Sequence, residues 1–112
     1  MRFLVVDDFM TMRRVVRGLL REMGFEEVDE ACDGSAALAS LGAAMADVVI
    51  TDIEMPILGG FALLSAIKKD ALLRDIPVLM VAADQIEAIA TALYGADGVD
   101  FLPQAETDLA RM

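Results

Sequence analysis

Three aspartates follow short apolar segments, and their carboxylates could act together if the fold brings those segments side by side. Asp7 and Asp8 come directly after the apolar run 3–6, and Asp52 comes directly after the apolar run 48–51. Carboxylates at close range repel one another, so one or more would stay protonated unless a cation relieved the repulsion. Oxygen ligands and several retained waters suit Mg²⁺. We therefore expect a Mg²⁺ site, which would also neutralise charge on a phosphoryl group approaching Asp52.

Each of these acids also has an ordinary structural role open to it. Asp8 could cap a following helix, Asp7 could be a solvated loop residue, and Asp52 could cap a turn at a strand end. Any one of them alone favours the structural role. All three at the ends of strands that must be neighbours favour the metal pocket.

The elements that must position these acids alternate along the chain. Short apolar runs predict strands, and apolar residues at helical spacing predict the helices between them. The predicted strands are 3–6, 27–30, 48–51, 76–81 and 99–102. The predicted helices are 11–23, 35–41, 61–69, 86–94 and 105–112, the last of them shortened.

This alternation predicts an α/β fold, an open, doubly wound, five-stranded parallel sheet. The first, third and fourth strands are apolar throughout, as strands covered on both faces should be. In the flavodoxin-like order 2-1-3-4-5, the first and third strands are neighbours, and ligands bind beyond the carboxyl ends of the strands. The three aspartates would then meet at one edge of the sheet.

Composition narrows the chemistry to carboxylates. The 112 residues predict one domain, 1–112, and 57% of them are apolar, enough for a continuous core. The net charge of −10 argues against nucleic acid or an anionic membrane as the main partner. The absence of histidine and the single cysteine, Cys32, exclude His-based catalysis, an internal disulfide and Cys-based zinc sites. We expect Cys32 to be buried and the chain to be cytoplasmic, since its apolar start is too short for a signal peptide.

Helix 11–23 is amphipathic. Its predicted apolar face consists of Met12, Val15, Val16, Leu19, Leu20 and Met23. Its opposite face carries Arg13, Arg14, Arg17 and Arg21. The arginine face is interpreted either as a docking surface for a kinase or phosphatase or as a solvated helix face.

Several short motifs together resemble response regulator receiver domains, in particular the CheY-like receivers of chemotaxis. The matching motifs are FLVVDDF at 3–9, TMRR at 11–14, GF at 24–25, DG at 33–34, DxxMP at 52–56, PVLMV at 77–81 and GA at 95–96. Each motif alone is weak, but in order they cover nearly the whole chain. The order 2-1-3-4-5 is that of flavodoxin and CheY themselves, so it rests on this resemblance and not on the residue pattern.

The resemblance implies a role for each acid. Asp52 would accept a phosphoryl group from a histidine kinase. Asp8, Asp52 and the backbone carbonyl of Glu54 would bind Mg²⁺, and Asp7 would act through metal-bound water. The signal would pass to a downstream effector protein through the face formed by the fourth helix, the fifth strand and the fifth helix. Such a chain is a signalling domain and not a conventional enzyme, with at most self-phosphorylation and self-dephosphorylation.

The sequence departs from the receiver pattern at the residues that would sense the phosphoryl group. The family carries Thr or Ser at the end of the fourth strand, where this chain has Ala82. The family carries Lys before a proline after the fifth strand, where this chain has Leu102 or Gln104, depending on the register. The aromatic switch position falls on Val99 or, with a gap, on Phe101. Losing one charge-assisted hydrogen bond costs about 1.5–3 kcal/mol, so coupling to the distant face should be poor.

Three functions remain consistent with the sequence. The first is a phosphoacceptor switch, and the second is a pseudo-receiver, a protein-binding module whose output does not depend on phosphorylation. The third is a Mg²⁺-dependent hydrolase with an aspartyl nucleophile and Glu54 as general acid, which the missing cap domain and the lack of a lysine in reach disfavour. The short last helix also leaves an apolar edge through which the chain could self-associate or bind a partner, unless the sequence is a piece of a longer one.

Overall fold

A computed structural model describes residues 1–82 of the chain. Its elements are β1 (Arg2–Val6), α1 (Met10–Glu22), β2 (Glu27–Ala31), α2 (Gly34–Ala43), β3 (Val48–Asp52), α3 (Gly60–Lys69) and β4 (Val78–Val81). The four strands form a parallel sheet in the order β2-β1-β3-β4. The predicted α/β fold and the first four strands of the predicted order are confirmed. The predicted elements 86–94, 99–102 and 105–112 lie outside the described residues.

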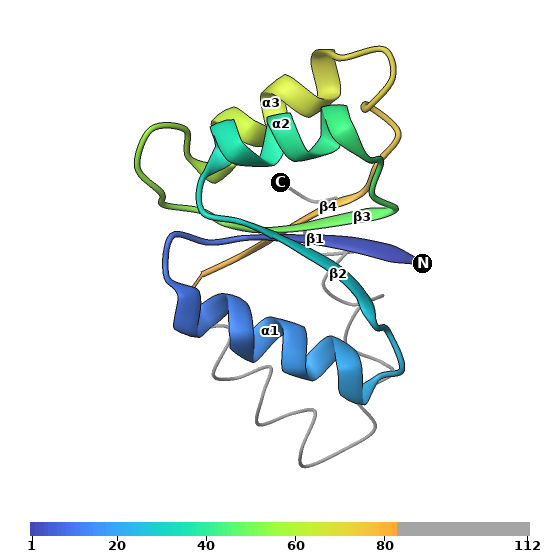
Figure 1. Cartoon of the computed structure of the whole chain (residues 1–112). Helices are drawn as coiled ribbons and strands as arrows, with labels where there is room; N and C mark the ends of the chain where they lie inside the picture. Colours follow the sequence, from blue (N-terminus) through green and yellow to red (C-terminus); the bar gives the residue numbers. More distant parts are fainter. Residues whose placement is uncertain (83–112) are drawn as a thin grey trace.

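Helices cover both faces of the sheet. Figure 1 shows α1 on one face and the pair α2 and α3 on the other. Alternate strand residues face the two layers, as the period of two requires. Phe3 and Val5 of β1 pack with α1, whereas Leu4 and Val6 pack with α2 and α3. This two-sided burial explains why β1, β3 and β4 are almost continuously apolar, whereas the edge strand β2 is not.

Most elements begin and end within two residues of their predicted limits. The strand β4 starts at Val78 because Ile76 still belongs to the preceding turn, where its N–H donates to the Leu73 carbonyl at 2.9 Å. The prediction that Val15 belongs to the buried face of α1 is wrong, since Val15 is exposed. The buried stripe is narrower and consists of Val16, Leu19 and Leu20, spaced three and four residues apart.

Two glycines allow the loop between β3 and α3 to lie close against the sheet edge. A β-carbon at Gly60 would overlap the backbone oxygen of Asp52, and one at Gly34 would lie 2.6 Å from the backbone oxygen of Leu58. The Gly60 N–H donates to the Ile53 carbonyl at 2.8 Å, and the Gly34 N–H donates to the Leu58 carbonyl at 3.0 Å. The first helical residues of α2 and α3 thus hold this loop by backbone contacts that leave no room for a side chain.

Replacing Gly60 by alanine should therefore disturb the backbone at Asp52. We expect Gly60→Ala to lower the free energy of unfolding by about 1–3 kcal/mol, because the clash involves backbone that cannot move aside cheaply. Gly42→Ala in α2 is the matched control, since a β-carbon there meets nothing within 4 Å. The control should be neutral or stabilising by up to about 1 kcal/mol. Urea denaturation of both variants measures the difference, and equal stabilities would contradict the close approach.

Candidate metal site at the carboxyl edge of the sheet

Strand register brings the three predicted aspartates together. Val6 at the end of β1 pairs with Thr51 of β3, so the residues that follow, Asp7 and Asp52, emerge side by side. One carboxylate oxygen from each of Asp7, Asp8 and Asp52 lies within 4.8 Å of the others. The predicted convergence of these three side chains is confirmed, and within residues 1–82 they form an acidic pocket that could hold a metal ion.

Asp7 is a buried member of this cluster. Its side chain accepts a hydrogen bond from the Phe9 N–H at 2.9 Å, and its own N–H donates to the Ala31 carbonyl of β2 at 3.1 Å. Burial raises the pKa of Asp7, the Phe9 hydrogen bond offsets this in part, and the charges of Asp52 and Asp8 raise it further. Only 5% of Asp7 is exposed, so it is not the solvated loop residue of the alternative interpretation.

Asp8 does not cap the helix that follows it. The N-cap of α1 is Phe9, and no side chain makes a capping hydrogen bond there. The Oδ1 atom of Asp8 is buried and has no hydrogen-bond partner in the described part of the chain. A buried carboxylate oxygen without a donor is costly and calls for a ligand. A cation between the three carboxylates would supply what this oxygen lacks.

Asp52 ends β3 with its side chain fixed by the backbone. Its Oδ1 accepts a hydrogen bond from the Ile53 N–H at 2.8 Å, so the turn-capping alternative holds in part for this residue. Burial nevertheless raises the pKa of Asp52, and the neighbouring charges of Asp8 and Glu54 add to the effect. Three carboxylates carry a charge of −3, and a divalent cation would reduce this to −1. The donor set therefore fits a hard divalent ion such as Mg²⁺.

The other predicted site residues fall into two groups. Ala82 comes directly after Val81, which pairs with Asp52, so an alanine stands beside the acid where the receiver pattern has a hydroxyl. Glu54 is exposed in the loop after Asp52. The switch positions Val99, Leu102 and Gln104 lie outside the described residues.

Both lysines of the chain lie at the end of α3 that points away from the acidic pocket. That helix begins beside Asp52 and runs away from it to Lys68 and Lys69 at its last turn. The Lys68 ammonium donates to the carbonyls of Arg74 and Ile76, at 3.0 and 3.2 Å, ahead of β4. The expectation that no lysine serves the pocket agrees with these contacts.

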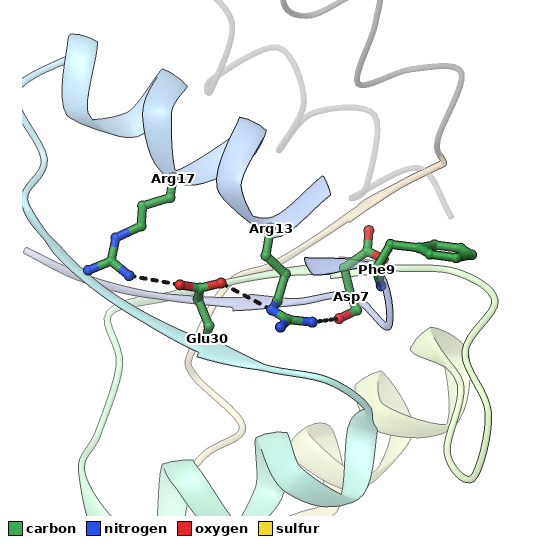
Figure 2. Close-up of polar contacts among 5 residues, drawn as sticks. All are labelled: Asp7, Phe9, Arg13, Arg17 and Glu30. Carbon is green, nitrogen blue, oxygen red and sulfur yellow. Dashed lines mark hydrogen bonds and ion pairs between the residues drawn. The ribbon is translucent and has the colours of Figure 1, made fainter. Parts of the chain in front are cut away.

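Sequence reasoning missed a network of arginines behind the pocket. Figure 2 shows Arg13 and Arg17 of α1 reaching one carboxylate, Glu30 of β2, while Arg13 also reaches Asp7. Glu30 lies on the same face of β2 as the core residue Val28, which is the signal that could have paired it with α1. These two arginines are therefore not simply a solvated face.

The expectation of a buried Cys32 is also wrong, since that residue is exposed.

The chain is similar to known proteins over most of its length. Residues 3–110 match the response regulator receiver domain. The chain belongs to this family. It is 43% identical to the chemotaxis protein CheY of Pseudomonas aeruginosa over 100 residues, which cover 88% of this chain and 81% of the relative. It is 44% identical to chemotaxis protein CheY-3 of Vibrio cholerae, over 88% of this chain and 77% of the relative.

Solved structures agree with the assignment to the receivers. The chemotaxis response regulator CheY4 of Vibrio cholerae superposes with a TM-score of 0.67 at 30% identity, covering 98% of this chain and 95% of the other. A receiver protein domain from Methanoculleus marisnigri superposes with a TM-score of 0.67 at 32% identity, covering 84% of this chain and 76% of the other. Among the described residues, no helix has the length and apolarity needed to cross a membrane.

The loop beside Asp52 contains a strained residue. Ile57 has a φ of 70°, in the left-handed region that β-branched residues rarely adopt. The Leu58 N–H donates to the Pro56 carbonyl at 2.8 Å, which closes a γ-turn around Ile57. The Ile57 side chain is 83% exposed, so its packing does not explain the strain.

Asparagine tolerates this conformation better than isoleucine does. We expect Ile57→Asn to raise the free energy of unfolding by about 1 kcal/mol, because the left-handed cost falls on the folded state alone. Leu72→Asn is the matched control, since Leu72 is 82% exposed and has no positive φ. Denaturant unfolding of both variants checks this, and a gain shared equally by the control would refute the strain at Ile57.

Removing one charge from the cluster should stabilise the metal-free protein. Raised pKa values mean that the folded state binds protons more tightly than the unfolded state. Stability therefore falls as pH rises from about 4, the ordinary aspartate range, through the raised values. At pH 7 without divalent cations, Asp52→Asn should increase the free energy of unfolding by roughly 0.5–2 kcal/mol.

The measurement is urea unfolding in a chelator at pH 4 and pH 7. The advantage of Asp52→Asn over the unchanged chain should be larger at pH 7, where the removed carboxylate would be ionised. Glu30 titrates in both proteins and cancels in the difference. An advantage that is absent at pH 7, or larger at pH 4, would show that repulsion in the cluster is unimportant.

Proposed function

We propose that this receiver accepts a phosphoryl group on Asp52 and binds Mg²⁺ in the adjoining acidic pocket. The observation that carries the proposal is the convergence of Asp7, Asp8 and Asp52, with a buried Asp8 oxygen that has no hydrogen-bond partner within residues 1–82. The phosphoryl donor would be a phosphohistidine of a histidine kinase, as expected for a receiver of the CheY-like class.

The chain's own residues divide the work as follows. The Asp52 carboxylate attacks phosphorus, the P–N bond of the phosphohistidine breaks as a P–O bond forms, and the bonding pair returns to the ring nitrogen. The imidazole leaves neutral, because it keeps the proton already on its other ring nitrogen. The Ile53 N–H holds the Asp52 carboxylate in place for this attack. Asp8, Asp52 and the backbone carbonyl of Glu54 would hold Mg²⁺, with Asp7 acting through bound water. The cation, when bound, supplies charge neutralisation for the phosphoryl oxygens.

Phosphorylation of Asp52 should be coupled only weakly to effector binding. Ala82 has no hydroxyl to follow a phosphoryl group on Asp52, and Leu102 and Gln104 offer no ammonium. We propose that phosphorylation occurs but shifts the effector-binding face little. A pseudo-receiver, whose binding of an effector is independent of phosphorylation, is the second candidate, and Ala82 is the residue that favours it.

The remaining expectations are part of the same proposal. Residues 1–112 act as one signalling domain, with no catalysis beyond self-phosphorylation and self-dephosphorylation. The domain works in the cytoplasm with a histidine kinase and a downstream effector protein, in a chemotaxis-like pathway. Self-association through the C-terminal edge would appear as a dimer in light scattering, and a strict monomer at high concentration would exclude it.

Treatment with acetyl phosphate tests the acceptor directly. With Mg²⁺, intact mass spectrometry should detect one added phosphoryl group, and chelation of Mg²⁺ should abolish it. Asp52→Asn should remove the modification, whereas Asp75→Asn, at an exposed position before β4, should keep it.

The outcomes separate the two candidates. Modification that survives in Asp52→Asn, or that needs no divalent cation, would contradict the proposed acceptor site. If the unchanged chain is modified but a partner binds it and Asp52→Asn equally, the pseudo-receiver is the better description.

A further inference from the structure

Arg13 joins the loop after β1, which carries Asp7 and Asp8, to the neighbouring strand β2. Its Nη1 donates to the Asp7 backbone carbonyl at 2.7 Å, and its Nε donates to Glu30 Oε1 at 3.0 Å. Figure 2 shows this guanidinium lying between the loop after β1 and the side chain from β2. The Arg13 side chain is only 16% exposed. The contact is thus largely shielded from water, where an ion pair is screened less than at the surface.

Glu30 is held firmly enough to act as an anchor for Arg13. Burial alone would raise the pKa of Glu30, but hydrogen bonds from Arg17 and Arg13 lower it below its ordinary range. Arg17 donates to the other oxygen, Oε2, at 2.7 Å. Each oxygen of Glu30 therefore faces one arginine, and the carboxylate has little freedom to turn.

The contact with the Asp7 carbonyl matters because of where that carbonyl lies. It belongs to the peptide group that joins Asp7 to Asp8. Peptide groups are planar, so fixing the oxygen also fixes the direction in which the chain enters Asp8. Asp8 has no capping bond to hold it, and its Oδ1 has no partner in the described part of the chain. The Arg13 contact, together with the hydrogen bond from the Phe9 N–H to the Asp7 carboxylate, thus fixes the backbone from which Asp8 projects.

We propose that Arg13, anchored by Glu30, is a positioning residue that presets the Asp7–Asp8 peptide for divalent-cation binding. The inference rests on the metal site proposed above and adds a group outside the set of carboxylates. Residues that orient metal ligands typically change metal affinity by about 10–100-fold when they are lost.

The sign of the effect distinguishes positioning from simple charge. Arg13 is cationic, so by long-range electrostatics alone its removal should strengthen binding of a cation to the pocket. Loss of positioning should weaken binding instead. The two explanations predict opposite changes in the same measurement, which makes the neutral variant at Arg13 decisive.

Isothermal titration of Mg²⁺ into the full chain tests the inference. Arg13→Gln should weaken Mg²⁺ binding about ten-fold, whereas Arg13→Lys, which keeps the charge and one donor, should recover part of the affinity. Arg14→Gln is the charge control because Arg14 is exposed on the same helix. Arg14→Gln should bind Mg²⁺ as tightly as the unchanged chain or slightly more tightly. Arg17→Gln loosens the Glu30 anchor but leaves the Asp7 carbonyl contact in place, so it should weaken Mg²⁺ binding less than Arg13→Gln does.

Affinity for Mg²⁺ in Arg13→Gln equal to or greater than that in Arg14→Gln would overturn the positioning role. Unfolding in a chelator shows whether each variant is folded before titration. If Arg13→Gln is not folded, Arg13→Lys is compared with the unchanged chain, and equal Mg²⁺ affinity would overturn the role. No Mg²⁺ uptake by the unchanged chain would instead refute the metal site itself.

Discussion

Mutual repulsion of three carboxylates is the constraint that dominates the functional edge of this receiver. Like charges about 5 Å apart repel by roughly 3 kcal/mol per pair at an effective dielectric constant of about 20. Three such pairs would consume much of the roughly 5–15 kcal/mol by which domains of this size are stable. Full ionisation of Asp7, Asp8 and Asp52 therefore needs compensation from a cation, or else one carboxylate keeps a proton. Burial is the main cause of the raised pKa values of Asp7 and Asp52, and the repulsion between the carboxylates raises them further.

The fold tolerates this repulsion because the strands that bring the aspartates together are buried in the apolar core on both faces. Val6 and Thr51 pair at the carboxyl ends of the two central strands, and the core on both faces fixes their register. A shift by one residue would turn every side chain to the other face. The aspartates cannot separate unless the strands slip, so the structure cannot relax the repulsion at this edge of the sheet.

Arginines of the described segment do not relieve the repulsion. Within residues 1–82 the ion pairs join Arg2 to Asp29 and both Arg13 and Arg17 to Glu30, and none reaches the three aspartates directly. Backbone N–H groups of Phe9 and Ile53 orient Asp7 and Asp52 without neutralising them. The pocket is thus ordered by dipoles and left strongly negative, which suits a site that must attract a cation.

Regular patterns carried the predictable part of the structure. Continuously apolar strands and helical spacing predicted the α/β sheet. The acids at strand ends predicted the cluster around Asp52 only together with the strand order, which rested on the resemblance to receivers. Contacts that depend on tertiary geometry were beyond the pattern. The narrow buried stripe of α1 excludes Val15, and the pairing of Arg13 with Glu30 crosses from a helix to a strand. The left-handed Ile57 contradicts the ordinary preference of its residue type, so the sequence pattern does not predict it.

The residues that would accept a phosphoryl group and the residue that would sense it follow different strands. One set can therefore change without the other. The acids and the peptide that Arg13 holds come from β1 and β3, whose pairing is complete. The position that would sense a phosphoryl group follows β4, where Ala82 supplies a methyl group in place of a hydroxyl. An alanine there removes a hydrogen bond without disturbing the carboxylates, because Val81 still pairs with Asp52. A receiver can therefore keep an acidic pocket suited to accepting a phosphoryl group after losing a group that would report it.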